Sequence, residues 1–269
     1  MDHANYLATV QGRVVLATVT FYKEESLRSR LAQQTIEKAT AAGYSIIVVD
    51  GSPNDLIKSL SGATVKVVPE ITYGLGAAKR LSFFMAMEYA YRCIPRRDIV
   101  VHLEAEKDDM IRWIPTLVAP IIGGAADVVV AERSAASWQS YPEFQAKTEA
   151  EGNFGLLSAT GLDVDIFVGP GAFHIERAGY YFVNAAPYLA AGLEQGEDTY
   201  AQHFGAISAH AHNCSVVASE LLDFIYPPEQ KADEEGGALD EKRIWQRGSL
   251  IATYQKLARH FGLPHFTRR

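Results

Sequence analysis

The chain has 269 residues, of which 48% are hydrophobic and 21% charged, a balance typical of a globular protein with a large buried core. Its formal net charge of −7 argues against a protein that binds the nucleic-acid backbone, because such a protein needs a basic face. No signal-peptide pattern opens the chain, no apolar run makes a convincing bilayer span, and Cys93 and Cys214 lie far apart. We therefore expect free thiols, a cytoplasmic location and no membrane insertion.

In chain order, the first half alternates between β-branched apolar segments and segments of helical composition. The expected strands are 14–20, 45–50, 64–68, 98–103 and 126–131, and the expected helices are 26–42, 74–92 and 110–122. This alternation predicts an α/β fold, in which helices flank both faces of a mostly parallel central sheet.

The second half is less regular. We expect helices at 144–157 and 173–182, a helix that starts at 197, short strands at 165–168 and 214–218, and a terminal helix at about 240–261. Gln145, Glu149 and Asn153 are spaced about one helical turn apart, so they form one polar helix face. The prolines and glycines of 226–240 predict a mobile loop there.

Charged side chains follow the ends of the expected strands. Parallel strands bring these ends to one edge of the sheet, where ligands of open α/β sheets bind. The loops at this edge carry Lys23, Glu24, Glu25, Asp50, Glu104, Glu106, Glu132 and Arg133. The sequence therefore predicts a ligand site at this edge.

The densest group of acids follows the apolar run 99–101. Glu104, Glu106, Asp108 and Asp109 stand within six residues, and carboxylates at a strand end suit a divalent cation that binds phosphate oxygens. The alternative is a solvated loop that begins a helix, because Asp108 and Asp109 are favourable at a helix N-terminus.

Six segments within about residues 14–200 resemble, in the same order, the nucleotide-sugar-dependent glycosyltransferases of the GT-A fold, especially the family-two group and its retaining relatives. They are Thr18–Glu25 (TVTFYKEE), Ile47–Ser52 (IVVDGS), Gly74–Arg80 (GLGAAKR), His102–Glu106 (HLEAE), Ala126–Arg133 (ADVVVAER) and Gly196–Asp198 (GED). The resemblance implies a Rossmann-like catalytic domain at 1–225, with a donor half at about 10–135 and an acceptor half at about 136–225. The C-terminal extension 226–269, a loop and a helix, is expected to pack on the same domain.

By this resemblance, the donor nucleotide contacts a set of side chains near the sheet edge, and Lys79 and Arg80 neutralise its diphosphate. The implied donor-binding residues are Thr18, Glu24, Asp50, Lys79, Arg80 and Arg133. Asp50 is equally well explained as a turn residue ahead of Gly51. Lys79 and Arg80 have the alternative of a solvated helix turn, although cations near a helix N-terminus oppose its dipole and a bound anion relieves that conflict.

Glu104-Ala105-Glu106 stands at the place of the family's Asp-x-Asp motif, which binds a divalent metal against the donor phosphates. The resemblance therefore implies Mg²⁺ or Mn²⁺ at Glu106 and Glu104, with Asp108 as the alternative if the register shifts. Both acids are glutamates here, which departs from the family pattern. His212, or His210, stands where some retaining relatives place a histidine ligand, and a structural histidine is the alternative.

Asp198, with Glu197 as second candidate, matches the acid that deprotonates the acceptor hydroxyl in inverting relatives. Helix capping is the alternative, because acids favour the first turn of a helix. The acceptor region also contains Gly169–Gly171, which lets a sugar approach the backbone closely, and the aromatic residues Trp138 and Tyr141, which suit either sugar stacking or core packing.

The expected function is transfer of a hexose from a UDP- or GDP-sugar to a hydroxyl of a small acceptor, with either stereochemical outcome. Arg243 or Arg247, beyond the predicted loop, is placed to contact phosphate if the loop closes over the donor. One alternative is a sugar-1-phosphate nucleotidyltransferase, although 18–25 has no Gly-rich run with Arg and Lys. Another is a non-catalytic nucleotide- or glycan-binding module, which the Glu-for-Asp exchange suggests.

Overall fold

The computed structural model describes residues 2–72, 74–193, 197–235 and 240–264, whose strands form one seven-stranded sheet in the order β3-β2-β1-β4-β6-β5-β7. The strands are β1 (Val14–Thr20), β2 (Ser45–Asp50), β3 (Val65–Pro69), β4 (Ile99–His102), β5 (Val128–Arg133), β6 (Gly171–His174) and β7 (Val216–Leu222). β6 runs antiparallel to β4 and β5, and the other neighbouring pairs are parallel. The predicted fold class, a mostly parallel α/β sheet, is confirmed.

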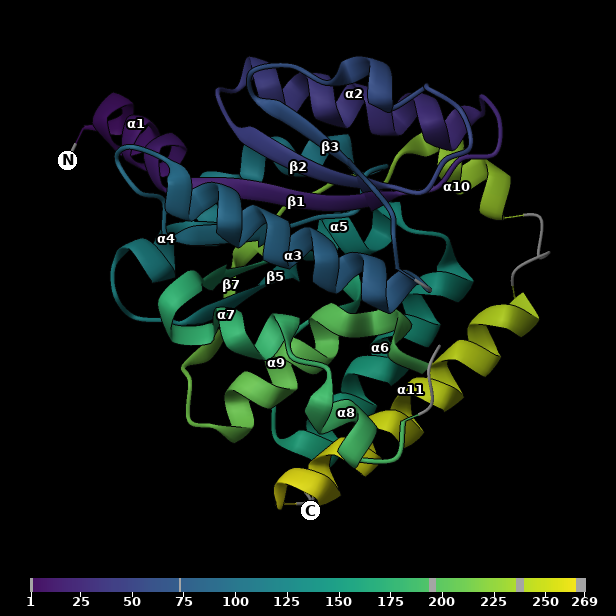
Figure 1. Ribbon diagram of the computed structural model, residues 1–269. Helices are drawn as coiled ribbons and strands as arrows, with labels where there is room; N and C mark the ends of the chain where they lie inside the picture. Colours follow the sequence, from purple (N-terminus) through teal and green to yellow (C-terminus); the bar gives the residue numbers. More distant parts are fainter. Residues whose placement is uncertain (1, 73, 194–196, 236–239, 265–269) are drawn as a thin grey trace.

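Helices cover both faces of this sheet (Figure 1). The helices are α1 (His3–Arg13), α2 (Leu27–Ala41), α3 (Leu75–Arg92), α4 (Ile114–Ile122), α5 (Ala135–Ser140), α6 (Glu143–Thr160), α7 (Ile175–Val183), α8 (Ala186–Ala190), α9 (Ala201–Ala211), α10 (Pro228–Glu234) and α11 (Asp240–Phe261). Within the described ranges, the 3₁₀ turns that connect them are η1 (Lys58–Leu60), η2 (Asp108–Trp113), η3 (Ile166–Val168) and η4 (Glu197–Tyr200). α11 packs along α6 and confirms the predicted C-terminal helix, and no described helix is both long and apolar enough to span a bilayer.

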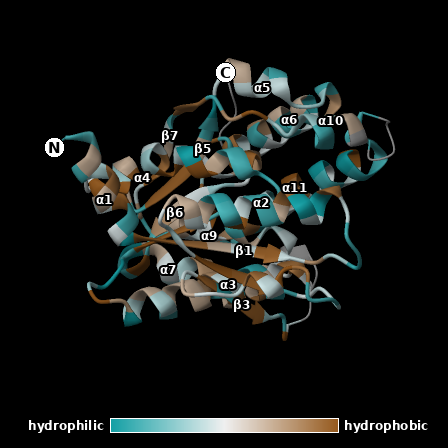
Figure 2. Ribbon diagram, turned by 90° about the horizontal axis from the view of Figure 1, so that it is seen from above, coloured by the Kyte–Doolittle hydropathy of each residue, from teal (hydrophilic) through white to brown (hydrophobic). Residues whose placement is uncertain are grey.

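The apolar run of β1 supplies two cores, one on each face of the sheet. Val14 and Leu16 belong to the core under α2 and α4, whereas Val15 and Ala17 belong to the core under α3. Successive side chains of a strand point to opposite faces, so a central strand buried on both sides reads as a continuous apolar segment. Figure 2 shows these hydrophobic strands between amphipathic helices. β1 is therefore held in the middle of the sheet by its own sequence.

Two predictions for the second half are wrong. The segment 165–168 is η3 and not a strand; the short strand is β6, inserted between β4 and β5, and it takes the first two residues of the helix expected at 173–182. The segment 226–240 is not a continuous loop, because 228–234 form α10. Pro228 and the acidic Glu229 favour the start of a helix there. Residues 236–239 lie outside the described part.

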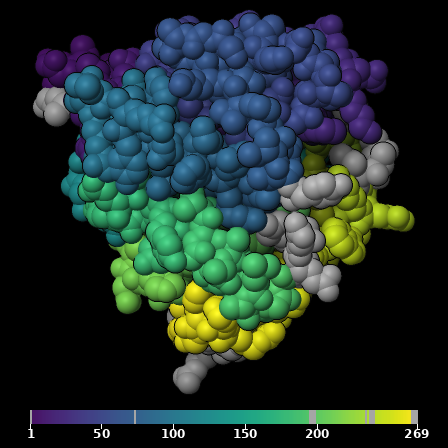
Figure 3. Space-filling view, viewed as in Figure 1, coloured from purple at the N-terminus to yellow at the C-terminus, as the bar shows by residue number. Residues whose placement is uncertain are grey.

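The two halves of the chain form neighbouring blocks on the surface in Figure 3, with the N-terminal segments above the later ones. Both blocks contribute strands to the one sheet, since β5, β6 and β7 continue the order set by β1 and β4. α10 returns from the second block to contact α2 of the first. The region between α2, α10 and the end of β4 is thus bounded by distant parts of the sequence.

Candidate functional site

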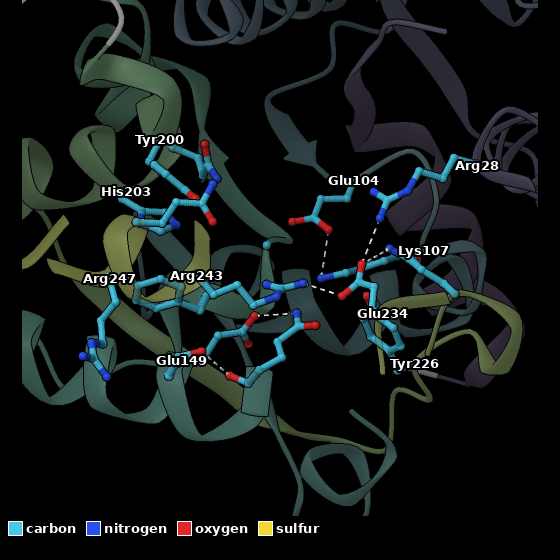
Figure 4. A pocket seen from close by; sticks show the side chains of 17 residues that line it. Arg28, Glu104, Lys107, Glu149, Tyr200, His203, Tyr226, Glu234, Arg243 and Arg247 are labelled. Carbon is cyan, nitrogen blue, oxygen red and sulfur yellow. Dashed lines mark hydrogen bonds and ion pairs between the residues drawn. The ribbon is translucent and has the colours of Figure 1, made fainter. Parts of the chain in front are cut away.

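A polar cavity lies beyond the carboxyl end of β4 and holds about 170 Å³ that water can occupy. Its wall comes from α2, the loop after β4, α6, the segment at Phe167 and Gly169, Tyr200 with α9, and Tyr226 with α10 and α11. The charged side chains that line it are Arg28, Glu104, Lys107, Glu149, Glu234, Arg243 and Arg247 (Figure 4). Four cations and three carboxylates therefore surround one small space.

Glu104 and Lys107 form an ion pair within this cavity. A backbone turn, in which Lys107 N–H donates to the Glu104 carbonyl, brings the two side chains to the same side. Lys107 Nζ lies 3.0 Å from Glu104 Oε2 and donates to the Val168 carbonyl at 2.6 Å. Burial lowers the pKa of Lys107, but the nearby Glu104 carboxylate and further anionic neighbours outweigh it, so the pKa lies above its ordinary value. Lys107 is a buried, charged ammonium.

Glu234 joins the two sides of the cavity. Its carboxylate accepts hydrogen bonds from Arg28 at 2.9 Å and from Gln230 at 3.2 Å, and it forms an ion pair with Arg243. Burial raises the pKa of Glu234, but Arg243 and the hydrogen bonds lower it further, so the net shift is downward. The carboxylate of α10 therefore ties α2 to α11 across the site, as the dashed lines in Figure 4 show.

Arg133, a predicted donor-binding residue, lies outside the cavity lining with a side chain that is 0% exposed. It donates to both carboxylate oxygens of Asp165, at 2.5 and 2.7 Å, and to Glu149 at 2.7 Å. Trp138 and Tyr141 flank the guanidinium, with ring centroids 3.5 and 4.4 Å away. Of this group, Glu149 lines the cavity, so Arg133 supports the site from behind rather than facing a ligand.

Glu106 and Glu104, the two predicted metal ligands, have different partners. Glu106 Oε1 accepts a hydrogen bond from the Tyr22 hydroxyl at 2.7 Å, and Glu106 is not among the cavity-lining residues. Burial raises the pKa of Glu106, although the Tyr22 hydrogen bond opposes this. Burial and the Glu106 charge also raise the pKa of Tyr22. Only Glu104 of this pair presents its carboxylate to the cavity.

The histidine candidates for a metal site lie at the far end of α9. His212 caps this helix with Nδ1 2.7 Å from the Ser208 carbonyl, and its ring stacks on Tyr181. His203, which does line the cavity, begins the same helix, so His212 lies nine residues or roughly 13 Å farther along the axis. Across the described ranges, no three His, Cys, Asp or Glu side chains gather as a metal-holding group.

The predicted donor residues at the ends of β1 and β2 are joined by hydrogen bonds. The Thr18 hydroxyl donates to the Leu103 carbonyl at 2.9 Å, and Asp50 accepts from the Thr20 and Ser52 hydroxyls at 2.8 and 2.6 Å. Glu24 is exposed in the loop after β1. Thr18 and Asp50 thus fix the backbone where β1, β2 and β4 end, and the turn explanation of Asp50 is consistent with its contact to Ser52.

Lys79 connects α3 to the second half of the chain. Its Nζ donates to the Thr199 carbonyl and to Gln202 Oε1, each at 3.0 Å, and Arg80 follows it in the same helical turn. Gln202 lines the cavity, so Lys79 lies directly behind that wall. Glu197 and Asp198, the predicted bases, begin η4 beside this contact, and their side chains lie outside the described part.

The described side chains that η4 and α9 contribute to the lining, Tyr200, Gln202 and His203, are uncharged. His203 Nδ1 lies 2.8 Å from the Tyr254 hydroxyl, and burial lowers the pKa of His203, which keeps its imidazole neutral. Burial also raises the pKa of Tyr200 to about 12. The site therefore has one neutral aromatic wall opposite the cluster of arginines and carboxylates.

Several lining residues have no role in the motif-based predictions. Lys107 is part of the acidic stretch after β4, and a lysine among four acids was the available signal. Arg28 and Glu234 meet although they are 206 positions apart, and no local pattern reveals such a pair. Gln145 and Glu149 do lie on the polar face predicted for 144–157, and that face is turned to the cavity.

The sheet order, with one antiparallel strand between β4 and β5 and a polar cavity at the carboxyl end of β4, has the GT-A architecture of nucleotide-sugar glycosyltransferases, and the predicted resemblance is confirmed at the level of the fold. No protein-family model and no curated protein matches the sequence.

Among solved structures, the chain is similar to glucosyl-3-phosphoglycerate synthase from Mycobacterium tuberculosis, with 17% identity, a TM-score of 0.52, and coverage of 98% of this chain and 86% of that one. A complex of that synthase with Mn²⁺, UDP and phosphoglyceric acid matches with 16% identity, a TM-score of 0.52, and coverage of 96% and 82%. A structure described only as a mycobacterial protein matches with 17% identity and a TM-score of 0.50, covering 98% and 80%. At these identities, the similarity establishes the fold alone.

Proposed function

We propose that the protein is a glycosyltransferase that moves a hexose from a UDP-sugar to a hydroxyl of a small anionic acceptor. The observation that carries the proposal is the cavity at the carboxyl end of β4, lined by Arg28, Arg243 and Arg247. A planar guanidinium matches carboxylate and phosphate groups bidentately, so such a wall suits ligands with these groups. The synthase with the similar fold was crystallised with UDP and phosphoglyceric acid, which are both anions.

The two halves of the chain have different proposed tasks. Residues from about 10 to 135 bind the nucleotide, with Thr18 and Asp50 at the carboxyl ends of β1 and β2 and Lys79 on α3, which contacts the cavity-lining Gln202. Residues 136–225, with the helices of 226–269, hold the acceptor against the arginine-lined wall. The Arg28–Glu234 contact joins the halves, so donor and acceptor meet where both contribute side chains.

In the proposed reaction, the acceptor oxygen forms a bond to the anomeric carbon while the bond from that carbon to the diphosphate oxygen breaks, and UDP leaves with the electron pair. On an inverting route, the proposed base that takes the hydroxyl proton is Asp198, which belongs to η4 together with the cavity-lining Tyr200. The Asp198→Asn variant is then expected to lose turnover, by about a hundredfold or more, while it still binds UDP. Near-normal turnover in that variant contradicts the assignment of the base.

A divalent metal was the expected partner of Glu104 and Glu106, and the mycobacterial synthase holds Mn²⁺ together with UDP. In this protein Glu104 is paired with Lys107, Glu106 with Tyr22, and His212 lies at the far end of α9. These side chains do not present a shared set of oxygen and nitrogen ligands to the cavity. The residues therefore do not fit the expected metal, and we propose that transfer proceeds without one.

The test is a transfer assay with UDP- and GDP-sugars against two acceptor panels of equal size, one anionic, beginning with phosphoglycerate, and one of neutral polyols. Release of the nucleoside diphosphate and the mass of the product are both measured. We expect transfer with a UDP-sugar and an anionic acceptor, weakened at least tenfold in the Arg243→Met variant through KM. Binding of UDP without turnover for every pair favours a binding module, and a preference for neutral acceptors contradicts the anionic one.

A further inference from the structure

Lys107 is the most deeply buried cation of the cavity lining, with a side chain 4% exposed, whereas its partner Glu104 is 47% exposed. Removing an ammonium from water is costly unless it is paired and hydrogen-bonded. Lys107 satisfies this requirement with Glu104 and the Val168 carbonyl, and the rings of Tyr141 and Phe224 lie 5.6 and 5.9 Å from Nζ. The structure thus retains a full positive charge at the bottom of the site.

The loops around the pair are shaped to keep Glu104 in this position. Gly169, with φ of +99°, lies against the Glu104 side chain, and a Cβ built there would come within 2.7 Å of Glu104 Oε1. A residue other than glycine is strained here by the backbone conformation, and its Cβ requires the Glu104 carboxylate to shift. Val168, the neighbour of Gly169, supplies the carbonyl that accepts from Lys107. One segment after α6 thus positions both members of the pair.

This arrangement places an ammonium where the carboxylate of Glu104 would otherwise attract a metal. An ammonium and a divalent cation that share one carboxylate repel each other, and a low-dielectric site strengthens this repulsion. The second acid of the motif, Glu106, is held by Tyr22 outside the cavity lining. The ammonium of Lys107 therefore balances the charge of Glu104, as a bound metal ion would otherwise do.

Lys107 also retains capacity for an anion. An ammonium has three N–H donors, and in the described part of the chain two acceptors, Glu104 Oε2 and the Val168 carbonyl, use two of them. The Arg28 and Arg243 guanidinium groups line the same cavity and hold the carboxylate of Glu234, so this space already accepts anionic oxygens. A diphosphate there would meet a fixed positive charge.

We propose that Lys107, paired with Glu104, supplies the positive charge that a nucleoside diphosphate needs in this site, so that the donor binds without a divalent cation. This inference rests on the proposed function and deepens it, because it places the donor diphosphate at the Lys107 end of the cavity and leaves the acceptor against Arg243 and Arg247. Lys107 is then a donor-binding residue and its pairing with Glu104 sets the geometry.

The experiment measures UDP binding to the wild-type protein by calorimetry, once with EDTA and once with excess Mn²⁺. We expect the dissociation constants with EDTA and with Mn²⁺ to agree within about threefold. An affinity that requires Mn²⁺, with a gain of tenfold or more, overturns the inference and leaves the proposed function intact. Undetectable UDP binding in both conditions overturns the proposed function, and this inference with it.

A second arm uses the variants Lys107→Met and Lys107→Arg, with Lys38→Met as the matched control. Lys38 forms an ion pair with Asp108 at the outside of the same loop, so its loss removes a salt bridge without touching the cavity. We expect about tenfold weaker UDP binding in Lys107→Met, as for a lost charge-assisted hydrogen bond, and recovery of most of it in Lys107→Arg.

A purely structural lysine gives a different pattern. It lowers the thermal midpoint of Lys107→Met but leaves the UDP dissociation constant of the folded protein equal to that of Lys38→Met, and this outcome overturns the inference. If Lys107→Met does not fold, the comparison of EDTA with Mn²⁺ in the wild-type protein decides alone, because it needs no variant.

Discussion

The buried guanidinium of Arg133 provides the sharpest stability prediction. Arg133→Met removes three hydrogen bonds and leaves the carboxylates of Asp165 and Glu149 buried, with side chains that are 2% and 9% exposed. Loss of one partner of a buried ion pair costs about 3–5 kcal/mol, because the remaining charge stays in a poorly solvating interior. We therefore expect the free energy of unfolding to fall by about 4 kcal/mol.

Urea unfolding followed by circular dichroism measures this change, and Arg92→Met is the matched control. Arg92 pairs with Glu88 on the surface of α3, four residues apart, so its loss costs only about 0.3–0.5 kcal/mol. If Arg133 instead binds the donor, as the motif resemblance implied, Arg133→Met leaves unfolding close to that of the control and weakens UDP binding. A loss of stability below about 1 kcal/mol refutes the reasoning from burial.

Two further predictions concern the cavity and the end of β4. Glu234→Gln removes the charge shared by Arg28 and Arg243, so we expect about 2 kcal/mol less protection of the α10 amides in hydrogen exchange; unchanged protection of these amides contradicts this role of Glu234. Burial, with a smaller contribution from Lys79, lowers the pKa of His102 to about 3, so the native state holds it neutral while the unfolded state binds a proton below pH 6.5. The free energy of unfolding of the wild-type protein, relative to that of His102→Gln, should then fall by up to about 1.4 kcal/mol per pH unit between pH 6.5 and 3. Urea unfolding at each pH measures this difference, and parallel pH profiles of the two proteins contradict the assignment.

The first half of the fold could be predicted because each of its strands has its own local signal. β1, β2 and β4 are apolar on both faces, and the helices between them end at glycine or at a turn, so alternation and boundaries agree. Parallel order then follows from the connections, since α2 joins β1 to β2 and α3 joins β3 to β4. At the carboxyl edge of this sheet, where the sequence predicts a ligand site, the structure has a polar cavity.

The second half could not be predicted as well, because its short elements depend on partners distant in sequence. β6 has four residues, and only the gap between β4 and β5 makes Gly171–His174 a strand. α10 has seven residues and little helical signal of its own, but the Glu234 contacts to Arg28 and Arg243 hold it in place. Tertiary contacts override weak local preference in both segments.

For the motif residues too, the sequence predicts where they lie in the fold but not which side chains they contact. The sequence places Glu104 and Glu106 correctly just beyond β4, yet the chain turns there, and each glutamate finds its own donor, Lys107 for Glu104 and Tyr22 for Glu106. Charge of one sign in a motif therefore does not establish that a metal balances it. In this protein the balancing charge for Glu104 is three residues away, and the metal dependence of UDP binding will decide whether Lys107 also serves the ligand.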